Sequence, residues 1–152
     1  MWMETVVKHH EEPPGINNVF SIYGHHTFRI NPCEFNKAVK LARQLGEIVD
    51  PSQVCIICFY KGQQYLLEAM RLPYSIMTVD SVQGKEYEAV ILLTTRTCGP
   101  GGFISEPHRI NVAITRARQA LFVLGSISYI EDLPEWCDIV EYARDHNMIT
   151  KK

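Results

Sequence analysis

The chain has 152 residues, of which 46% are hydrophobic and 21% are charged, and its formal net charge is -2. This is the composition of a globular domain with a real core, and it excludes a strongly basic surface that would attract nucleic acid everywhere. No apolar run approaches the roughly 20 residues that cross a bilayer, and no signal peptide opens the chain. We therefore expect no membrane partner and an intracellular protein of the cytoplasm or nucleus.

The N-terminal segment is polar and contains the breakers Pro13, Pro14 and Gly15. Proline and glycine interrupt helices and strands, because proline lacks a backbone N–H and glycine is too flexible. We predict a linker or tether over residues 1–18 and one folded domain over residues 19–152.

A helix start is predicted at Asn31, which can act as the N-cap, with Pro32 at the first helical position and Glu34 at the third. Gly46 is expected to end this helix. Further elements are expected as strands at residues 19–23, 54–59, 76–79, 89–94 and 120–124 and as helices at residues 61–70 and 134–146. This alternation predicts an α/β fold with a mostly parallel β-sheet and helices on both faces, which binds ligands at the carboxyl ends of its strands.

Cys55 and Cys58 form a C-x-x-C pair inside the apolar strand at residues 54–59. Residues three apart on a strand point to opposite faces of the sheet, so these thiols cannot easily share a metal ion. We predict buried structural cysteines and no metal site, against the zinc or redox role that the spacing alone suggests.

Residues 109–118 are predicted to form one helix rich in arginine. Its apolar positions recur at helical spacing, at Ile110, Ala113, Ile114 and Ala117. The other faces carry three arginines, and the segment contains no acid to neutralise them. Guanidinium groups held on a packed helix are suited to binding phosphate oxygens.

The loop between the third and fourth predicted strands is polar. Gly84 permits a backbone turn that a side chain would block, and Ser81 and Gln83 can form hydrogen bonds with phosphate or ribose. Glu86 can accept a hydrogen bond from a ribose hydroxyl. Asp80 is expected to brace the loop by accepting hydrogen bonds from nearby backbone N–H groups.

The loop and the arginine-rich segment together resemble motifs V and VI of superfamily 1 helicases, in the Upf1-like subgroup. Residues 78–86 match the pattern V-D-x-x-Q-G-x-E, and residues 109–118 match R-x-N-V-A-x-T-R-A-R. Residues 57–63 resemble motif IV, and residues 101–104 resemble the G-F-x segment that precedes motif VI. The resemblance spans residues 19–146 and implies a single RecA-like domain, the second of the two that enclose ATP in this family.

The resemblance also implies which residues carry the function. Arg116 resembles the arginine finger that reaches the γ-phosphate, a contribution worth ~10³–10⁵ in rate that links domain closure to catalysis. The residues implied to bind ATP are Gly84, Glu86, Gln83 and Arg118. The residues implied to bind nucleic acid are Thr78, Ser81, Tyr60 and Gln63.

The phosphate-binding loop G-x-x-x-x-G-K-[ST] does not occur in the sequence, and no Asp-Glu pair follows an apolar strand. The resemblance therefore implies half of an ATP site, with ATP and Mg²⁺ held mainly by a first RecA-like domain of the parent protein. It implies an isolated chain without activity, single-stranded RNA or DNA as a partner, and 5′-to-3′ movement. One departure is Pro32, which stands where some relatives place an arginine near the γ-phosphate; Arg29 is the nearest substitute.

Three functions stay open. The first is the motor half of an ATP-dependent helicase, which Arg116 and Glu86 favour. The second is a non-catalytic helicase-like module that binds nucleic acid or protein, which Pro32 and the near-neutral charge favour. The third is a stand-alone nucleotide-binding fold, which is disfavoured because no phosphate-binding glycine loop follows the first strand.

Overall fold

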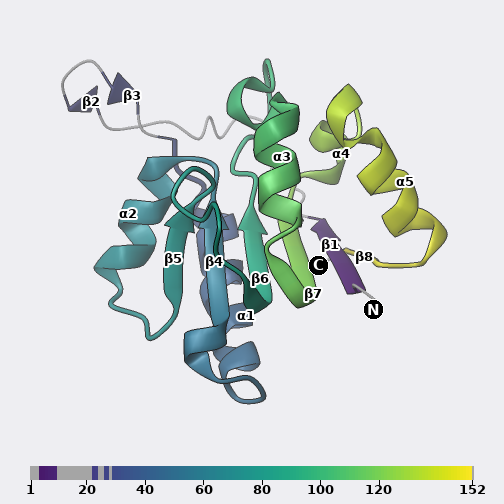
Figure 1. The fold of residues 1–152 in the computed structure, drawn as a ribbon. Coiled ribbons are helices and arrows are strands. Elements are labelled where there is room, and N and C mark those ends of the chain that lie inside the picture. The colour runs from purple at the N-terminus through teal and green to yellow at the C-terminus, as the bar shows by residue number, and fades with distance from the viewer. Residues whose placement is uncertain (1–3, 10–21, 24–25, 28, 152) are drawn as a thin grey trace.

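The structure is a computed structural model that describes residues 4–9, 22–23, 26–27 and 29–151 (Figure 1). Its centre is a six-stranded sheet in the order β5-β4-β6-β7-β1-β8, and every neighbouring pair in it is parallel. These strands are β1 (Glu4–His9), β4 (Val54–Cys58), β5 (Ser75–Thr78), β6 (Tyr87–Leu93), β7 (Ala117–Gly125) and β8 (Ile149–Lys151). A separate antiparallel pair consists of β2 (Ile22–Tyr23) and β3 (His26–Thr27).

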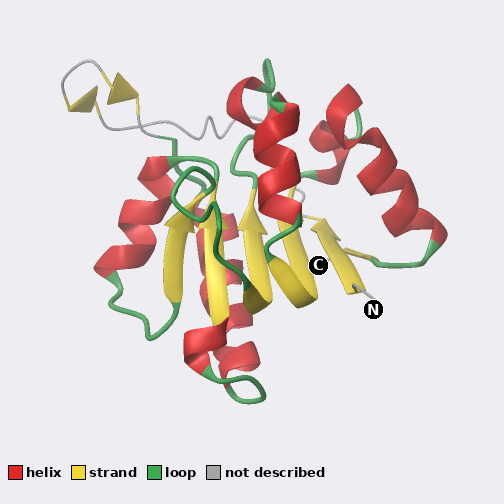
Figure 2. Cartoon of the chain, viewed as in Figure 1, coloured by secondary structure: helices red, strands yellow, loops and turns green. Residues whose placement is uncertain are grey.

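Helices cover both faces of the sheet, so the predicted α/β architecture is confirmed (Figure 2). Helix α1 lies behind the sheet in this view, and α3 lies in front of it. The α-helices are α1 (Pro32–Gly46), α2 (Lys61–Ala69), α3 (Pro107–Ile114), α4 (Ile127–Ile130) and α5 (Cys137–Asp145). Short 3₁₀ helices are η1 (Pro51–Gln53), η2 (Gly102–Ser105) and η3 (Pro134–Trp136). No helix in the described part of the chain is long and apolar enough to span a membrane.

Strand β4 shows how the sheet is buried on both sides, because its alternating side chains enter different cores. Ile56 and Cys58 pack in the core under α1, whereas Cys55 and Ile57 pack in the core under α3, α4 and α5. The two cysteines therefore lie on opposite faces, as predicted. Burial raises the pKa of the Cys55 thiol to about 12, which keeps the thiol protonated and unreactive at neutral pH.

The start of α1 is confirmed in detail. The Asn31 side chain accepts a hydrogen bond of 3.0 Å from the Glu34 N–H, and Pro32 occupies the first helical position. The Asn31 N–H, which a capping box would pair with the Glu34 carboxylate, donates to the Gln63 side chain instead. The Glu34 carboxylate accepts from the N–H of Thr95 at 3.0 Å, and so ties α1 to the end of β6.

The predicted linker over residues 1–18 needs correction, because residues 4–9 form β1 and pair in parallel with β7. The polar surroundings and the later prolines concealed this strand, whose partner lies more than a hundred residues away in the chain. Residues 10–18 lie outside the described residues. Of the strand predicted at residues 19–23, only Ile22–Tyr23 is described, and it pairs with β3 instead of joining the main sheet.

The predicted helix over residues 109–118 is wrong in its second half. Helix α3 ends at Ile114, and β7 begins at Ala117. Thr115 is the C-cap of this helix, and its hydroxyl donates to the main-chain carbonyl of Asn111 at 2.8 Å. Arg116 therefore lies in the turn between α3 and β7.

Candidate functional site

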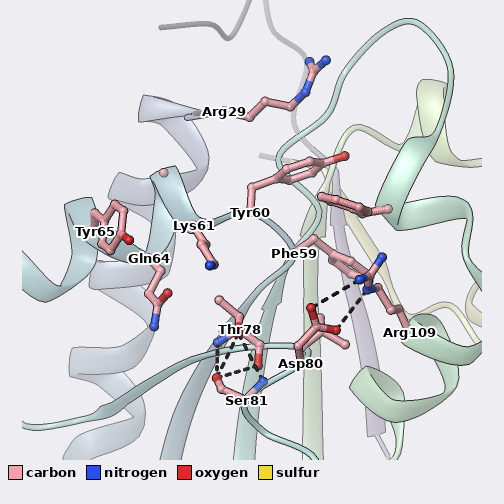
Figure 3. A pocket seen from close by; sticks show the side chains of 13 residues that line it. Arg29, Phe59, Tyr60, Lys61, Gln64, Tyr65, Thr78, Asp80, Ser81 and Arg109 are labelled. Carbon is pink, nitrogen blue, oxygen red and sulfur yellow. Dashed lines mark hydrogen bonds and ion pairs between the residues drawn. The ribbon is translucent and has the colours of Figure 1, made fainter. Parts of the chain in front are cut away.

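A groove of about 1010 Å³ opens at the carboxyl ends of β4 and β5 (Figure 3). The end of β5 and the residues after it form the floor, with Thr78, Asp80 and Ser81, and α2 forms one side. Arg109 of α3 lies on the opposite side, and Tyr60 lies above the floor. The groove therefore lies where ligands bind in parallel α/β sheets, as predicted.

Thr78 and Ser81 are joined by a closed set of hydrogen bonds. The Ser81 hydroxyl accepts from the Thr78 N–H at 2.9 Å, and the Thr78 hydroxyl accepts from the Ser81 N–H at 3.2 Å. The two hydroxyl oxygens are 3.0 Å apart. This turn keeps two polar side chains at the floor of the groove in one arrangement, which suits a contact to a ligand backbone.

Tyr60, which lies between β4 and α2, is only 8% exposed yet lines the groove. Its ring centroid lies 5.8 Å from that of Phe103 and 5.9 Å from the guanidinium carbon of Arg29. Burial raises the pKa of the Tyr60 hydroxyl, and the positive charges of Arg96 and Arg29 oppose this shift. The hydroxyl therefore stays protonated and can act as a hydrogen-bond donor near neutral pH.

Arg109 is held by two carboxylates and one ring. Its Nε and Nη2 donate to the two oxygens of Asp80 at 3.0 and 3.3 Å, and its Nη1 donates to Glu106. The guanidinium carbon lies 4.4 Å from the centroid of the Phe103 ring. The hydrogen bond that Arg109 donates to Asp80, more than any other contact, raises the pKa of Arg109. Asp80 thus braces its loop through a side chain of α3 and not, as predicted, through nearby N–H groups.

Gln63 does not fit the predicted contact with nucleic acid. Its side chain is fully buried, and its amide accepts from the Asn31 N–H and donates to the Asn31 carbonyl, both at 2.9 Å. Gln63 is absent from the residues that line the groove. Its role in this structure is to fix the start of α1 against α2.

Arg116 differs from Arg109, because no carboxylate forms an ion pair with it among the described residues. Its Nη1 donates to the main-chain carbonyl of Lys85 at 3.3 Å, and its Nη2 donates to the Thr115 hydroxyl at 3.0 Å. Its Nε is buried and makes no hydrogen bond within the described part of the chain. Unused donor capacity and an uncompensated charge leave this guanidinium suited to binding an anion.

The loop beside Arg116 carries the residues predicted to bind ATP. Gly84 has a φ of +80°, and no atom lies within 4 Å of the position of a Cβ there, so the glycine is required by its backbone conformation and not by space. Gln83 and Glu86 are exposed. The loop thus presents polar groups next to a guanidinium with spare donors.

Arg118 lies on β7, not on a helix. Its Nε donates to Glu88 at 2.9 Å, its Nη1 donates to the carbonyl of Glu86 at 3.4 Å, and its Nη2 donates to Gln53. These partners hold it between β6, β7 and η1. Arg118 is therefore placed to support the loop that carries Glu86.

The structure divides the predicted residues into two places. Thr78, Ser81 and Tyr60 share the groove, whereas Gly84, Glu86, Gln83, Arg116 and Arg118 gather where the loop approaches β7. Arg29 lines the groove, so it does not lie beside Arg116 as a substitute for the arginine missing at Pro32. Sequence reasoning missed Lys61, Phe103 and Arg109 as groove residues. The G-F segment before motif VI was the available signal for Phe103.

Comparison with known proteins finds a matching family model and several proteins of similar sequence. A family model described as an AAA domain matches residues 7–128. The chain is 29% identical to the mouse 3'-5' exoribonuclease HELZ2, over 84% of this chain and 5% of that protein. It is 31% identical to regulator of nonsense transcripts 1 of Dictyostelium discoideum, over 78% of this chain and 10% of that protein. The chain thus spans a tenth or less of these relatives.

Among solved structures, the fold is similar to the C-terminal domain of a possible DNA helicase from Lactobacillus. The TM-score is 0.56 at 14% identity, and the match covers 80% of this chain and 79% of that chain. This likeness supports the fold, and the sequence matches support the family. The chain belongs to the AAA domain family, and its motifs and sequence relatives identify it as the second RecA-like domain of the Upf1-like superfamily 1 helicase type.

Proposed function

We propose that this domain supplies the arginine finger and part of the nucleic-acid track of an ATP-dependent helicase. The observation that carries the proposal is the state of Arg116, which lies beside the loop of Gly84 and Glu86 with no carboxylate partner among the described residues. An arginine paired with an acid would have to break that pair before it could bind phosphate. Arg116 only has to exchange a main-chain carbonyl and a hydroxyl.

In this proposal Arg116 stabilises the charge that develops on the phosphoryl group during ATP hydrolysis. Glu86 and Gln83 bind the sugar and phosphates, Gly84 provides the turn, and Arg118 supports the loop from behind. Mg²⁺ would neutralise phosphate charge and, with ATP, would be held mainly by the first RecA-like domain of the parent protein. The isolated domain would have no appreciable activity.

The groove is the proposed site for single-stranded nucleic acid. Thr78 and Ser81 offer fixed hydroxyl groups, Tyr60 offers an aromatic ring, and Lys61 and Arg29 add positive charge. These contacts can be made to a phosphate and sugar backbone without reading its sequence. The relative named as a regulator of nonsense transcripts favours RNA as the strand and the cytoplasm or nucleus as the place of action.

The alternative is a helicase-like module that binds without catalysis. Pro32 supports it, because a proline at the start of α1 has no guanidinium that could bind phosphate. Arg29 does not replace it there, because Arg29 lines the groove. The two functions differ in whether removal of Arg116 changes ATP turnover.

The test is Arg116→Ala in the parent protein. We expect nucleic-acid-stimulated ATP turnover to fall by about 10³-fold or more, while ATP binding changes little. Arg144→Ala is the matched control, because Arg144 is an exposed arginine on α5 whose partner is Glu131. ATP turnover is measured in the presence of single-stranded RNA and, separately, of single-stranded DNA, and the two rates are compared. A parent protein without ATP turnover would favour the non-catalytic module, and so would an Arg116→Ala variant with the same ATP turnover as the parent.

A further inference from the structure

Phe103 is an exposed aromatic residue that the proposed catalytic chemistry does not use. Its side chain is 51% exposed, although the next residue, Ile104, is fully buried. Single exposed apolar residues are common on protein surfaces and need no explanation. Phe103 differs from them because it lines the groove between a cation and a second aromatic ring.

The turn that presents Phe103 is held from several sides. The indole N–H of Trp136, a fully buried residue, donates to the Ile104 carbonyl at 2.6 Å. Gly102 has a φ of +57°, and a Cβ there would lie 2.6 Å from Nη1 of Arg96. Because the backbone around Phe103 is held in this way, little ordering of the turn is needed when a ligand binds.

The neighbours of the ring also leave surface available. The Arg109 guanidinium lies over the ring at 4.4 Å and is itself held by Asp80. The Tyr60 ring is inclined at 38° to that of Phe103, with centroids 5.8 Å apart, so the two rings do not close against each other as a parallel stack. A flat ligand can therefore meet the exposed half of the ring.

Charge in the groove selects the kind of ligand. Among the described residues, the lining contains three cations, Arg29, Lys61 and Arg109, and one carboxylate, Asp80. Arg109 and Asp80 satisfy each other, whereas Arg29 and Lys61 form no ion pair with another described residue. A ligand with a flat aromatic part and a negative backbone matches both the ring and these two charges.

We propose that Phe103 is a stacking platform for one unpaired base of a single-stranded nucleic acid, whose phosphates contact Lys61 and Arg29. This inference rests on the proposed function of the groove and adds that the groove holds a base as well as the backbone. Every base has a π-face, so such a platform tolerates any sequence. A base in a duplex is already stacked on its neighbours, so the platform selects single strands.

The test measures binding by the parent protein of a short single-stranded oligonucleotide and of the same strand with its bases removed. Phe103→Ala is expected to weaken binding of the base-bearing strand by about 10–100-fold and to leave binding of the abasic strand unchanged. Phe103→Trp restores binding, because tryptophan also offers a flat ring. Tyr142→Ala is the matched control, since Tyr142 is an aromatic residue on α5, 45% exposed, stacked on His146 and not part of the groove.

The double variant Arg29→Ala and Lys61→Ala separates this inference from the function on which it rests. It should weaken binding of both strands, with and without bases. If that variant binds both strands like the parent, the groove does not bind nucleic acid and the proposed function fails there. If it weakens both while Phe103→Ala changes neither, or changes both equally, the stacking platform alone is overturned.

Discussion

Arg109 and Arg116 stand at the two ends of α3 and belong to the same sequence motif, yet their surroundings are opposite. Arg109 has two carboxylates and an aromatic ring as partners, and it fastens the loop of Asp80 to the first turn of the helix. Within the described part of the chain, Arg116 has only a carbonyl and a hydroxyl as hydrogen-bond partners, and one buried nitrogen has none. The same residue type therefore serves as a structural clamp at one end and as an available charge at the other.

This difference shows that a run of arginines is informative only together with its acids. The acids that neutralise Arg109 and Arg118 lie elsewhere in the chain, on the loop, on β6 and just before α3. The arginine motif alone does not reveal which guanidinium is neutralised. The structure leaves Arg116 as the one arginine of the motif without a described carboxylate partner.

The strongest test of the comparison is substitution by lysine at both ends of α3. Arg116→Lys keeps the charge but loses the planar fork, so kcat for ATP turnover in the parent protein should fall by about 10²–10³-fold. Arg109→Lys keeps an ion pair with Asp80 and should change kcat by less than about threefold. Steady-state ATPase assays measure both. Equal losses would show that the two arginines do not differ in role.

The free energy of unfolding should respond in the opposite order, with the larger loss at Arg109 and the smaller one at Arg116. Arg109→Ala removes a two-oxygen contact to Asp80 and the packing on Phe103, and we expect it to lower the free energy of unfolding by about 1–2 kcal/mol. Arg116→Ala removes two neutral hydrogen-bond partners and one uncompensated charge, and should change it by less than about 0.5 kcal/mol. Urea unfolding followed by tryptophan fluorescence suits this measurement, because Trp136 is fully buried. A larger loss for Arg116→Ala would contradict the assignment of clamp and finger.

A further small effect is expected for the coupling between Asp80 and Arg109 themselves. A double-mutant cycle with Asp80→Ala and Arg109→Ala should give an interaction energy of about 0.5–1 kcal/mol, since the Asp80 carboxylate is largely exposed. Added salt should reduce it. The exposed pair of Arg144 and Glu131 provides the reference cycle. A coupling of zero would mean that Asp80 does not brace the loop.

Local patterns predicted the elements whose signals lie close together in sequence. The start of α1 was readable because Asn31 and Glu34 are neighbours, and the two-sided burial of β4 was readable from strand alternation. The end of α3 could not be predicted from the sequence, because Ala117 continues the helical spacing of Ile110 and Ala113 although it belongs to a strand. All three side chains are buried, so apolar periodicity could not separate the helix from the strand.

The candidate site shows the same limit. The backbone turn at Gly84 was predicted correctly, because a glycine in a polar loop commonly adopts a positive φ. The burial of Gln63 was not predictable, since its partner Asn31 lies 32 residues away. Asp80 lies 29 residues from its partner Arg109, and Glu88 lies 30 residues from its partner Arg118, so these ion pairs also depend on tertiary structure.

The connection from β5 to β6 has a consequence for how the length of this chain can vary. Parallel strands are usually joined by a dozen or more residues that include a helix, but here only residues 79–86 pass over β4 to reach the next strand. Without a helix, its carbonyls at Lys85 and Glu86 are satisfied by arginine side chains. Because this connection is so short, we expect insertions and deletions among relatives to occur in other connections and not in this one.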